Sequence, residues 1–522
     1  MNKILNIGIL VALIALAVLI GVIRVNTGYA LSGDTGQIYM ILQNIYDGMG
    51  PHNQILPSLM DLSASKHAYL TMPIIEFCKN NLSTGPFLSS EHNHFQLHTY
   101  FVMYLMSAFV FFFKVPYVIN VINTLAFILF IYISFRYASK NIKWYYAIAI
   151  ITVVAFHPAW SWSFIGQPYI DKIFLPLGLL IINECEKEFN SNKKIFILII
   201  LAGLIVEKVI IYVGIYLLTT SILNYKNFKN KKILILRILF SVVMLLGVYF
   251  GIKLFMITHW YGSAVSLNVF TILNLLQDQR FFNGFITLLI VSAPLLIPSL
   301  VFRKKLFIIA FGMLVPNLIG TIGGAEKVGF FTHYHTLYFP FLVYGFIFSC
   351  NSYFTKYVRS NLAKFIGILY LLFSAVFYIL VGFNSNLQLQ FVSVKNSDIF
   401  IKHLNTIWNM PNEFNKISAT IDNIIPKDAM VSTIEPGWPY LYKHKDLVTY
   451  PFNIKTSDFL IVNYTKINNS YTYYGYISYL GKEITDQANA CLMNKIENSN
   501  FDTANPVILN SSMAILKKVT LK

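Results

Sequence analysis

Charged side chains are scarce in this 522-residue sequence, since Asp, Glu, Lys and Arg make up only 12% of it. Soluble domains carry roughly twice that fraction. Hydrophobic residues make up 56% and aromatic residues 16%, and a soluble globule of that composition could not cover its core. Apolar runs of about 20 residues recur, each long enough to cross a hydrocarbon core ~30 Å thick. The composition predicts a multi-spanning membrane protein and excludes collagen, coiled-coil, disordered and small secreted classes.

Cysteine is also rare, with Cys78, Cys185, Cys350 and Cys491 as the full set. There is no C-x-x-C pair and no zinc-type spacing, so we expect neither a disulfide framework nor thiol chemistry. The chain also lacks an internal repeat, a Gly-rich phosphate loop and a low-complexity tract. These absences remove the common sequence signatures of solenoids and nucleotide-binding folds.

The net charge of +17 comes from 40 Lys and Arg against 23 Asp and Glu. The basic residues lie mainly in short loops between apolar runs, which indicates membrane topology and lipid contact rather than nucleic acid. The N-terminal run 4–23 has no convincing cleavage site, so we interpret it as an uncleaved first span. The later apolar runs are 116–135, 144–158, 171–183, 195–223, 233–256, 284–302, 306–321, 336–350 and 362–383.

The loops between these runs set the predicted orientation. The loop 136–143 carries Arg136, Lys140 and Lys143, whereas the much longer stretch 24–114 holds few cations. By the positive-inside rule the first is cytoplasmic and the second is outside. The expected cytoplasmic basic clusters are 136–143, 187–194, 226–232, 303–305 and 356–364, and every histidine then falls outside.

Two segments need separate treatment. Residues 96–113 are apolar enough to span, but a span there would place the basic clusters outside, so we expect them to lie flat in the outer interface. The run 195–223 carries Glu207-Lys208 at its centre. Two short helices meeting at that pair would keep both flanking basic clusters inside. This interpretation gives eleven spans, an inside N-terminus and an outside C-terminus.

From about residue 384 the composition becomes that of a soluble domain. A helix is expected over 412–423 and strands over 429–433, 459–463 and 513–518. The predicted domains are therefore a transmembrane domain, 1–383, whose first outer loop 24–114 bears interfacial helices, and an extracytoplasmic α/β domain, 384–522.

Asp34 opens a segment in which Ile38, Ile41, Leu42 and Ile45 follow at helical spacing, typical of an amphipathic helix on the outer surface. Asp34 could simply cap this helix, with Gln37 closing a capping box. It could instead be a carboxylate held at the membrane rim as a general base. Both readings remain open from spacing alone.

Acidic residues at membrane depth are costly and mark candidate sites. Asp171 lies where a span begins, either as a partner of Lys172 or as a site residue. Glu207 and Lys208 lie at the tip of the predicted helical hairpin. They could neutralise each other, but a recessed Lys208 ammonium is also suited to a lipid-linked phosphate.

Histidines supply further candidates. Glu91, His94 and His98 are spaced at i, i+3 and i+7, which on one helix face would permit a metal site, although ordinary hydrogen bonding is the commoner role. Arg280, Lys327, His333 and His335 are predicted outer-loop groups that could contact phosphate or remain solvated.

Several short motifs follow one another in a specific order: Asp34 to Gly48, EHNHFQLH, QPYIDKIFLPLGLL, VEKVIIYVGIY, HYHTLYFPF, and finally IPKDAMVST with SDFLIVNY. This order resembles a bacterial membrane family described as a domain of unknown function. It also resembles the GT-C glycosyltransferases, including aminoarabinose and protein mannosyl transferases. The chain has Asp-Thr-Gly where those enzymes carry a paired Asp-Glu or D-x-D, and Glu-Lys where the closer family carries Lys-Glu.

The GT-C resemblance implies an all-α polytopic fold and an integral-membrane glycosyltransferase using a polyprenyl-phosphate sugar. It implies Asp34 as catalytic base, Asp171 as second acidic residue, and Lys208 with His335, His333 or Arg280 at the donor phosphate. Gln37, Glu207, His94 and His98 would support them. The acceptor would be a glycan, lipid or protein; no cofactor is required, and a divalent metal stays an alternative. The rival hypotheses are a lipid-linked saccharide flippase and a non-catalytic receptor or scaffold.

Overall fold

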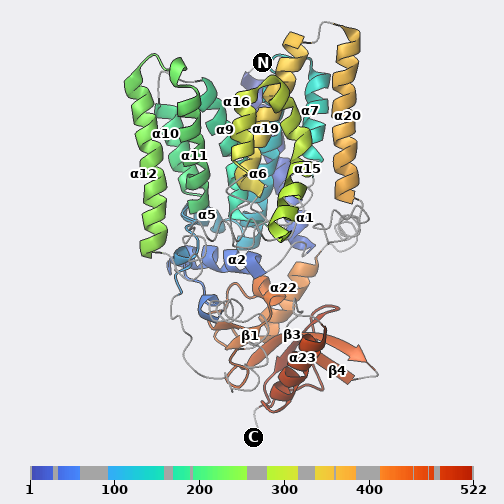
Figure 1. The fold of residues 1–522 in the computed structure, drawn as a ribbon. Coiled ribbons are helices and arrows are strands. Elements are labelled where there is room, and N and C mark those ends of the chain that lie inside the picture. Colours follow the sequence, from blue (N-terminus) through green and yellow to red (C-terminus); the bar gives the residue numbers. More distant parts are fainter. Residues whose placement is uncertain are drawn as a thin grey trace. The chain divides into compact units, whose positions relative to one another are not determined.

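The computed structural model describes residues 3–27, 33–58, 92–157, 168–187, 192–255, 279–314, 335–357, 360–383, 412–450, 452–467, 470–474 and 482–519. These residues are mostly helical, with one small sheet near the C-terminus (Figure 1). The chain divides into two compact units. The helical unit comprises Met1–Arg24, Gln96–Val102 and Tyr117–Asn409, and the mixed unit comprises Val25–Phe95, Met103–Pro116 and Met410–Lys522.

The helices of the helical unit run side by side in Figure 1. In chain order they are α1 (Lys3–Asn26), α6 (Val115–Ala138), α7 (Trp144–Ala155), η2 (Ile170–Ile173), α9 (Phe174–Lys187), α10 (Lys193–Gly203), α11 (Glu207–Leu223), η3 (Tyr225–Asn227), α12 (Lys231–Phe255), α15 (Gln279–Phe302), α16 (Lys304–Gly312), α19 (His335–Ser352), η4 (Tyr353–Tyr357) and α20 (Asn361–Phe383). α1 and α6 each extend a short way into the mixed unit.

Five of these helical stretches are long and apolar enough to cross a membrane, within the residues described. They are Gly8–Asn26, Val115–Ala138, Lys231–Ile252, His335–Lys356 and Asn361–Leu380. Two shorter apolar helices, Trp144–Ala155 and Leu288–Phe302, accompany them. These helices support the membrane class of the protein, and the count of eleven spans stays a prediction.

The predicted break in the run 195–223 is confirmed. α10 ends at Gly203 and α11 begins at Glu207. The segment 96–113, expected to lie flat, starts at the last residue of the three-residue η1 (His94–Gln96) and contains α5 (Val102–Val110). A nine-residue helix reaches only about 14 Å at 1.5 Å per residue, which is too short for a span.

Three helices of the helical unit, α9, α11 and α19, run in the same direction. Gly178 lies against Pro340, where an added Cβ would come within 2.8 Å of the ring, so this close packing requires glycine. The Tyr216 hydroxyl approaches the carbonyl oxygen of Ile182 at 3.4 Å, and its ring lies 5.0 Å from that of Phe341. These contacts place the N-termini of all three helices at one end of the unit.

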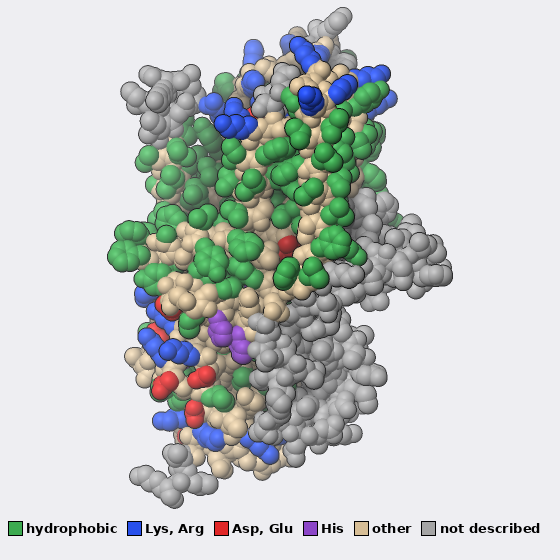
Figure 2. Space-filling model, turned by 90° about the vertical axis from the view of Figure 1, so that its left-hand side faces the viewer, with side chains coloured by type: hydrophobic (Ala, Val, Ile, Leu, Met, Phe, Trp, Pro, Cys, Tyr) green, Lys and Arg blue, Asp and Glu red, His purple; other side chains and the backbone are tan. Residues whose placement is uncertain are grey.

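The opposite end of the helical unit carries the basic loops. The Lys187 ammonium lies 5.7 Å from the centroid of the Tyr137 ring, and the Asn351 amide donates to the Tyr137 carbonyl at 2.9 Å. Lys305 donates to Asn224 at 3.0 Å. These contacts join the loops that carry the predicted basic clusters. Figure 2 shows Lys and Arg side chains gathered at this end, next to a band of hydrophobic side chains.

The mixed unit contains a six-stranded sheet in the order β2-β1-β3-β6-β5, with β4 also paired to β3. Its strands are β1 (Val431–Thr433), β2 (Leu447–Thr449), β3 (Phe459–Ile467), β4 (Ser470–Tyr474), β5 (Val507–Ile508) and β6 (Met513–Lys517). β1 pairs in parallel with β2 and β3, and the other pairs are antiparallel. α22 (Glu413–Ile424), η5 (Glu435–Tyr440) and α23 (Lys482–Glu497) complete this part.

Helix α2 (Gly33–Tyr46) also belongs to the mixed unit, where it packs on η5. A Cβ on Gly36 would meet Trp438 at 2.5 Å, so the two backbones approach too closely for any larger residue. The Tyr39 and Tyr442 rings meet edge to face at 6.0 Å. Thr35 through Leu42 are all buried, so α2 is covered on every side and the predicted polar face is wrong. Its place at the outer membrane surface stays a prediction.

The sequence predicts no disulfide framework, yet the protein contains a disulfide. Cys491, in α23 of the mixed unit, is disulfide-bonded. Cys185 and Cys350 of the helical unit are free and buried. The low cysteine count obscured this bond, since a single bridge needs no framework spacing.

Candidate functional site

The break between α10 and α11 holds a buried carboxylate in place. Glu207 accepts hydrogen bonds from His98 Nδ1 at 2.9 Å, from the Thr99 backbone N–H at 2.9 Å and from the Thr99 hydroxyl at 3.2 Å. Because a carboxylate oxygen only accepts, Nδ1 of His98 carries the hydrogen. The Val102 N–H donates to the Leu204 carbonyl at 2.7 Å. Segment 98–102 is therefore fixed along the break between the two helices.

Asp171 precedes α9 in the short helix η2 and is only 1% exposed. The charged groups that act on it electrostatically are Lys208, His98 and Glu207. The structure thus brings together four residues predicted separately from three distant segments of the chain. A buried carboxylate requires charged or hydrogen-bonding partners, because moving one charge out of water costs on the order of several kcal/mol.

Lys172 and Arg24 extend this group. Both side chains are buried, and Lys172 interacts electrostatically with Arg24 and with Asp171. We call the whole set the polar cluster: Arg24, His98, Asp171, Lys172, Glu207 and Lys208. Its formal charges are three positive, from Arg24, Lys172 and Lys208, against two negative.

The polar cluster lies at the N-terminal ends of α9 and α11, since η2 leads directly into α9 and Glu207 opens α11. Helix N-termini carry partial positive charge and favour anions. Excess formal positive charge, burial and two helix N-termini all favour an anionic ligand here. A phosphate group has the charge and acceptor oxygens that this environment suits.

His335 begins α19 at the same end of the unit, and η2 packs against α19. Its Nδ1 hydrogen-bonds the Tyr338 hydroxyl. His157, at the end of α7, interacts electrostatically with His335 and lies between the rings of Phe339 and Tyr378, each 4.7 Å away. The described histidines of the helical unit therefore lie away from its basic end. His333 falls outside the described residues, as does the side chain of Arg280.

Asp34 lies in the mixed unit, in the first turn of α2. Its carboxylate accepts a hydrogen bond from Gln37 Nε2 at 3.3 Å, and Gln37 Oε1 accepts one from Asn53 Nδ2 at 3.1 Å. Asn53 Nδ2 also lies 3.0 Å from His94 Nδ1. Since Nδ2 can only donate, both partners act as acceptors, and a neutral His94 carries its hydrogen on Nε2. The hydrogen bonds that link Asp34, Gln37, Asn53 and His94 hold the Asp34 side chain in one orientation.

Two predictions about this region need correction. Asp34 stands inside α2, which begins at Gly33, so it is a first-turn residue and not the cap. Gln37 binds the Asp34 side chain instead of closing a capping box. His94 and His98 do not share a helix face, because η1 ends at Gln96 and they bind different partners. Glu91 lies outside the described residues.

No set of three or more His, Cys, Asp or Glu side chains that could hold a metal ion occurs in the part of the chain that the structure describes. The polar cluster supplies an ammonium and a guanidinium, which suit a phosphate directly. Sequence reasoning missed two residues of this region, Arg24 of the polar cluster and Thr99 beside it, and it considered Lys172 only as a partner of Asp171. In the mixed unit it missed Asn53, which binds Gln37. Arg24 and Lys172 carried a detectable signal, since each is a cation at the edge of an apolar run.

No protein-family model matches this chain, and no curated protein matches it. The resemblance to GT-C transferases therefore rests on the order of the short motifs alone.

Proposed function

We propose that this protein is an integral-membrane glycosyltransferase that moves a sugar from a polyprenyl-phosphate donor to an acceptor at the extracytoplasmic face. The observation that carries the proposal is the polar cluster. It combines excess formal positive charge, burial of Arg24, Asp171, Lys172 and Glu207 beside the half-buried Lys208, and two helix N-termini. A lipid-linked phosphate needs both a cationic pocket and an apolar surrounding for its chain.

In the proposed reaction an acceptor hydroxyl attacks the anomeric carbon of the donor sugar. Asp34 takes the hydroxyl proton as the new C–O bond forms, and the bond from the anomeric carbon to the phosphate oxygen breaks with inversion. The polyprenyl phosphate leaves with the electron pair of that bond. Lys208, helped by His335, stabilises the charge that develops on the phosphate, an effect worth most where water is excluded. Asp171 orients the sugar or the acceptor.

The proposal requires that Asp34 of the mixed unit and Lys208 of the helical unit act on one substrate. Two observations support roles for both residues. Asp34 is exposed, yet its rotamer is held through Gln37 and Asn53. Glu207 is held by three donors at the start of α11, and this anchors Lys208 in the first turn of that helix. Preorganised side chains of this kind suit catalysis.

The proposed location is a bacterial cytoplasmic membrane, with the N-terminus inside and the mixed unit outside. The basic loops gather at the end of the helical unit away from the polar cluster, as the positive-inside rule expects for a cytoplasmic end. The disulfide at Cys491 suits an oxidising compartment, whereas the free Cys185 and Cys350 lie in the helical unit.

The test is binding of a short-chain polyprenyl phosphate to the purified protein. Lys208→Gln should weaken binding by roughly 10²-fold, as expected for loss of a buried charge-assisted contact worth about 3 kcal/mol. The control is Lys194→Gln, which removes an exposed cation at the basic end and should leave binding unchanged. Equal affinity of wild type and Lys208→Gln would reject the phosphate site.

A further inference from the structure

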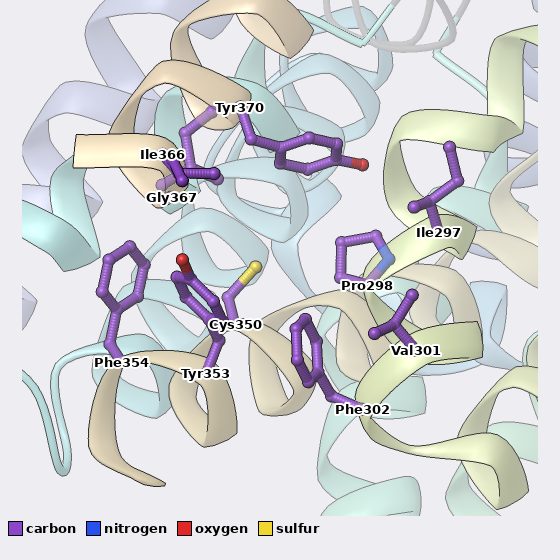
Figure 3. Close-up of a pocket in the computed structure, with 11 residues that line it drawn as sticks. Ile297, Pro298, Val301, Phe302, Cys350, Tyr353, Phe354, Ile366, Gly367 and Tyr370 are labelled. Atoms are coloured by element: carbon purple, nitrogen blue, oxygen red, sulfur yellow. The ribbon is translucent and has the colours of Figure 1, made fainter. Parts of the chain in front are cut away.

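An apolar pocket lies in the helical unit, at the end away from the polar cluster. It has a volume of about 190 Å³ and opens between α15, η4 and α20 (Figure 3). Ile297 and Val301 of α15 line one side, Tyr353 of η4 lines the base, and Ile366 of α20 lines the other side. Sites that enclose a whole small molecule are usually ~300–1,000 Å³. This volume suits a stretch of hydrocarbon chain entering from the side.

The local backbone explains why the pocket exists. η4 is a π-helical turn that widens the end of α19, and such turns recur at functional sites. Pro298 in α15 has no N–H to give the Pro294 carbonyl, and the Tyr370 hydroxyl donates to that carbonyl at 2.7 Å instead. The Tyr353 hydroxyl likewise donates to the Ala363 carbonyl. The two hydroxyls nearest the pocket are thus used within the protein, and its lining offers a ligand only apolar contact.

The pocket is open on the surface that faces lipid. Val301 is 59% exposed and Ile366 is 53% exposed, although both belong to apolar helices. α20 is among the helices able to cross a membrane, and the α15 stretch Leu288–Phe302 is apolar. The occupant must therefore reach the pocket from the hydrocarbon layer.

Three cationic residues adjoin the lining residues along the chain, and Arg303 donates to the Ser352 hydroxyl, next to the lining residue Tyr353, at 2.8 Å. Arg303 directly follows the lining residue Phe302, Lys356 follows Phe354 by two positions, and Lys364 precedes Ile366 by two. All three side chains are exposed. An apolar pocket with a cationic rim complements an amphiphile that has an apolar tail and an anionic head.

We infer that this pocket binds one acyl chain of an anionic glycerophospholipid, whose phosphate is held by Arg303, Lys356 and Lys364. The inference is independent of the proposed transfer reaction, because the pocket lies between α15, η4 and α20, whereas the polar cluster is built from α1, segment 98–102, η2 and α11. The bound lipid fills a gap between α15 and α20 that the protein side chains leave open.

The test is native mass spectrometry of delipidated protein titrated with phosphatidylglycerol or with phosphatidylcholine of the same acyl chains. Wild type should retain one phosphatidylglycerol at concentrations where phosphatidylcholine is not held. Ile366→Trp fills the pocket mouth and should abolish this retention. The control Leu372→Trp places the same bulk on another exposed position of α20, 60% exposed and outside the lining, and should retain the lipid.

Headgroup selection is tested by Lys356→Gln with Lys364→Gln. Each substitution should reduce the preference for phosphatidylglycerol about fivefold, the effect of one lysine near a lipid surface. If Ile366→Trp fails to fold, Val301→Trp fills the mouth from the opposite helix. Unchanged retention in the folded pocket variant, equal retention of the two lipids by wild type, or displacement by a polyprenyl phosphate would each overturn the inference.

Discussion

The helical unit and the mixed unit bury their polar groups in different ways. In the helical unit, four of the five buried charged side chains that the structure describes belong to the polar cluster, and the fifth, Arg237, donates to Asn192 at 3.0 Å and lies against the Phe228 ring. In the mixed unit, the amides of Gln37 and Asn53 link Asp34 to His94. The first arrangement suits binding of an anion, and the second suits positioning of a single reactive side chain.

This difference assigns separate tasks to the two units. Binding of the donor phosphate should depend on Lys208 of the helical unit, whereas the chemical step should depend on Asp34 of the mixed unit. Variants that affect one task and spare the other therefore test the comparison.

The largest expected effect is on turnover. Asp34→Asn removes the proposed base but keeps the size of the side chain and its contact with Gln37, so transfer should fall by 10²-fold or more, the contribution typical of a general base. Binding of polyprenyl phosphate should be unchanged. Transfer is measured as labelled product in proteoliposomes with lipid-linked sugars from the native membrane.

The matched control for this experiment is Asp47→Asn. Asp47 directly follows α2, is exposed, and accepts hydrogen bonds from Gln43. It should retain full turnover. Equal loss in both variants would show that the charge of α2, and not a base at Asp34, is what matters.

The second effect concerns stability of the mixed unit. Cys491→Ser removes the disulfide and should lower its free energy of unfolding by about 2–4 kcal/mol. Hydrogen exchange should accelerate in α23 and β6 but not in α19. Reductant should reproduce the change in wild type and add nothing to the variant. A wild type insensitive to reductant would contradict the bond.

The third effect concerns packing of α2 on η5. Gly36→Ala places a Cβ about where the Trp438 and Pro439 backbone lies, with contacts of 2.7 and 2.8 Å to the carbonyl carbon and the nitrogen. Backbone cannot yield easily, so we expect a loss of about 1–3 kcal/mol, seen as faster exchange in α2. Gly251→Ala in α12, where nothing lies within 4 Å, should cost nothing. Similar exchange in both variants would argue against the close approach.

The smallest expected effect is on the pH dependence of the stability of the mixed unit. Burial lowers the pKa of His444 below its ordinary value, and its Nε2 lies 3.4 Å from the Ile425 carbonyl. Below about pH 6.5 the unfolded chain binds a proton that folded His444 resists, so stability of the mixed unit falls as pH drops through that value. His444→Gln should flatten this dependence in urea midpoints taken between pH 7.5 and 5.5. An equally steep dependence in that variant would assign the effect to another group.

Sequence reasoning predicted the helices and strands better than it predicted the side-chain contacts between distant segments. The charge pair Glu207-Lys208 in a long apolar run was enough to predict the helix break, because two charges inside one span would be costly. The strands around Val431, Phe459 and Met513 were also predicted. Short β2 and β5 were not, since two or three residues carry too little periodicity.

Partners distant along the chain were beyond prediction. Glu207 binds His98 across 109 positions, and Asn53 binds His94 across 41. The helical spacing of Glu91, His94 and His98 was misleading, because the helix there lasts only three residues. Burial of α2 depends on Gly36 meeting Trp438, a contact that local amphipathicity does not encode.

The most direct test of the central claim is a cryo-electron microscopy map of the protein with a short-chain polyprenyl phosphate bound. The account predicts phosphate density in contact with Lys208 and the Asp34 carboxylate facing that phosphate across no more than the space of one sugar. Phosphate density away from the polar cluster, or an Asp34 side chain on the far side of the membrane from it, would contradict the account.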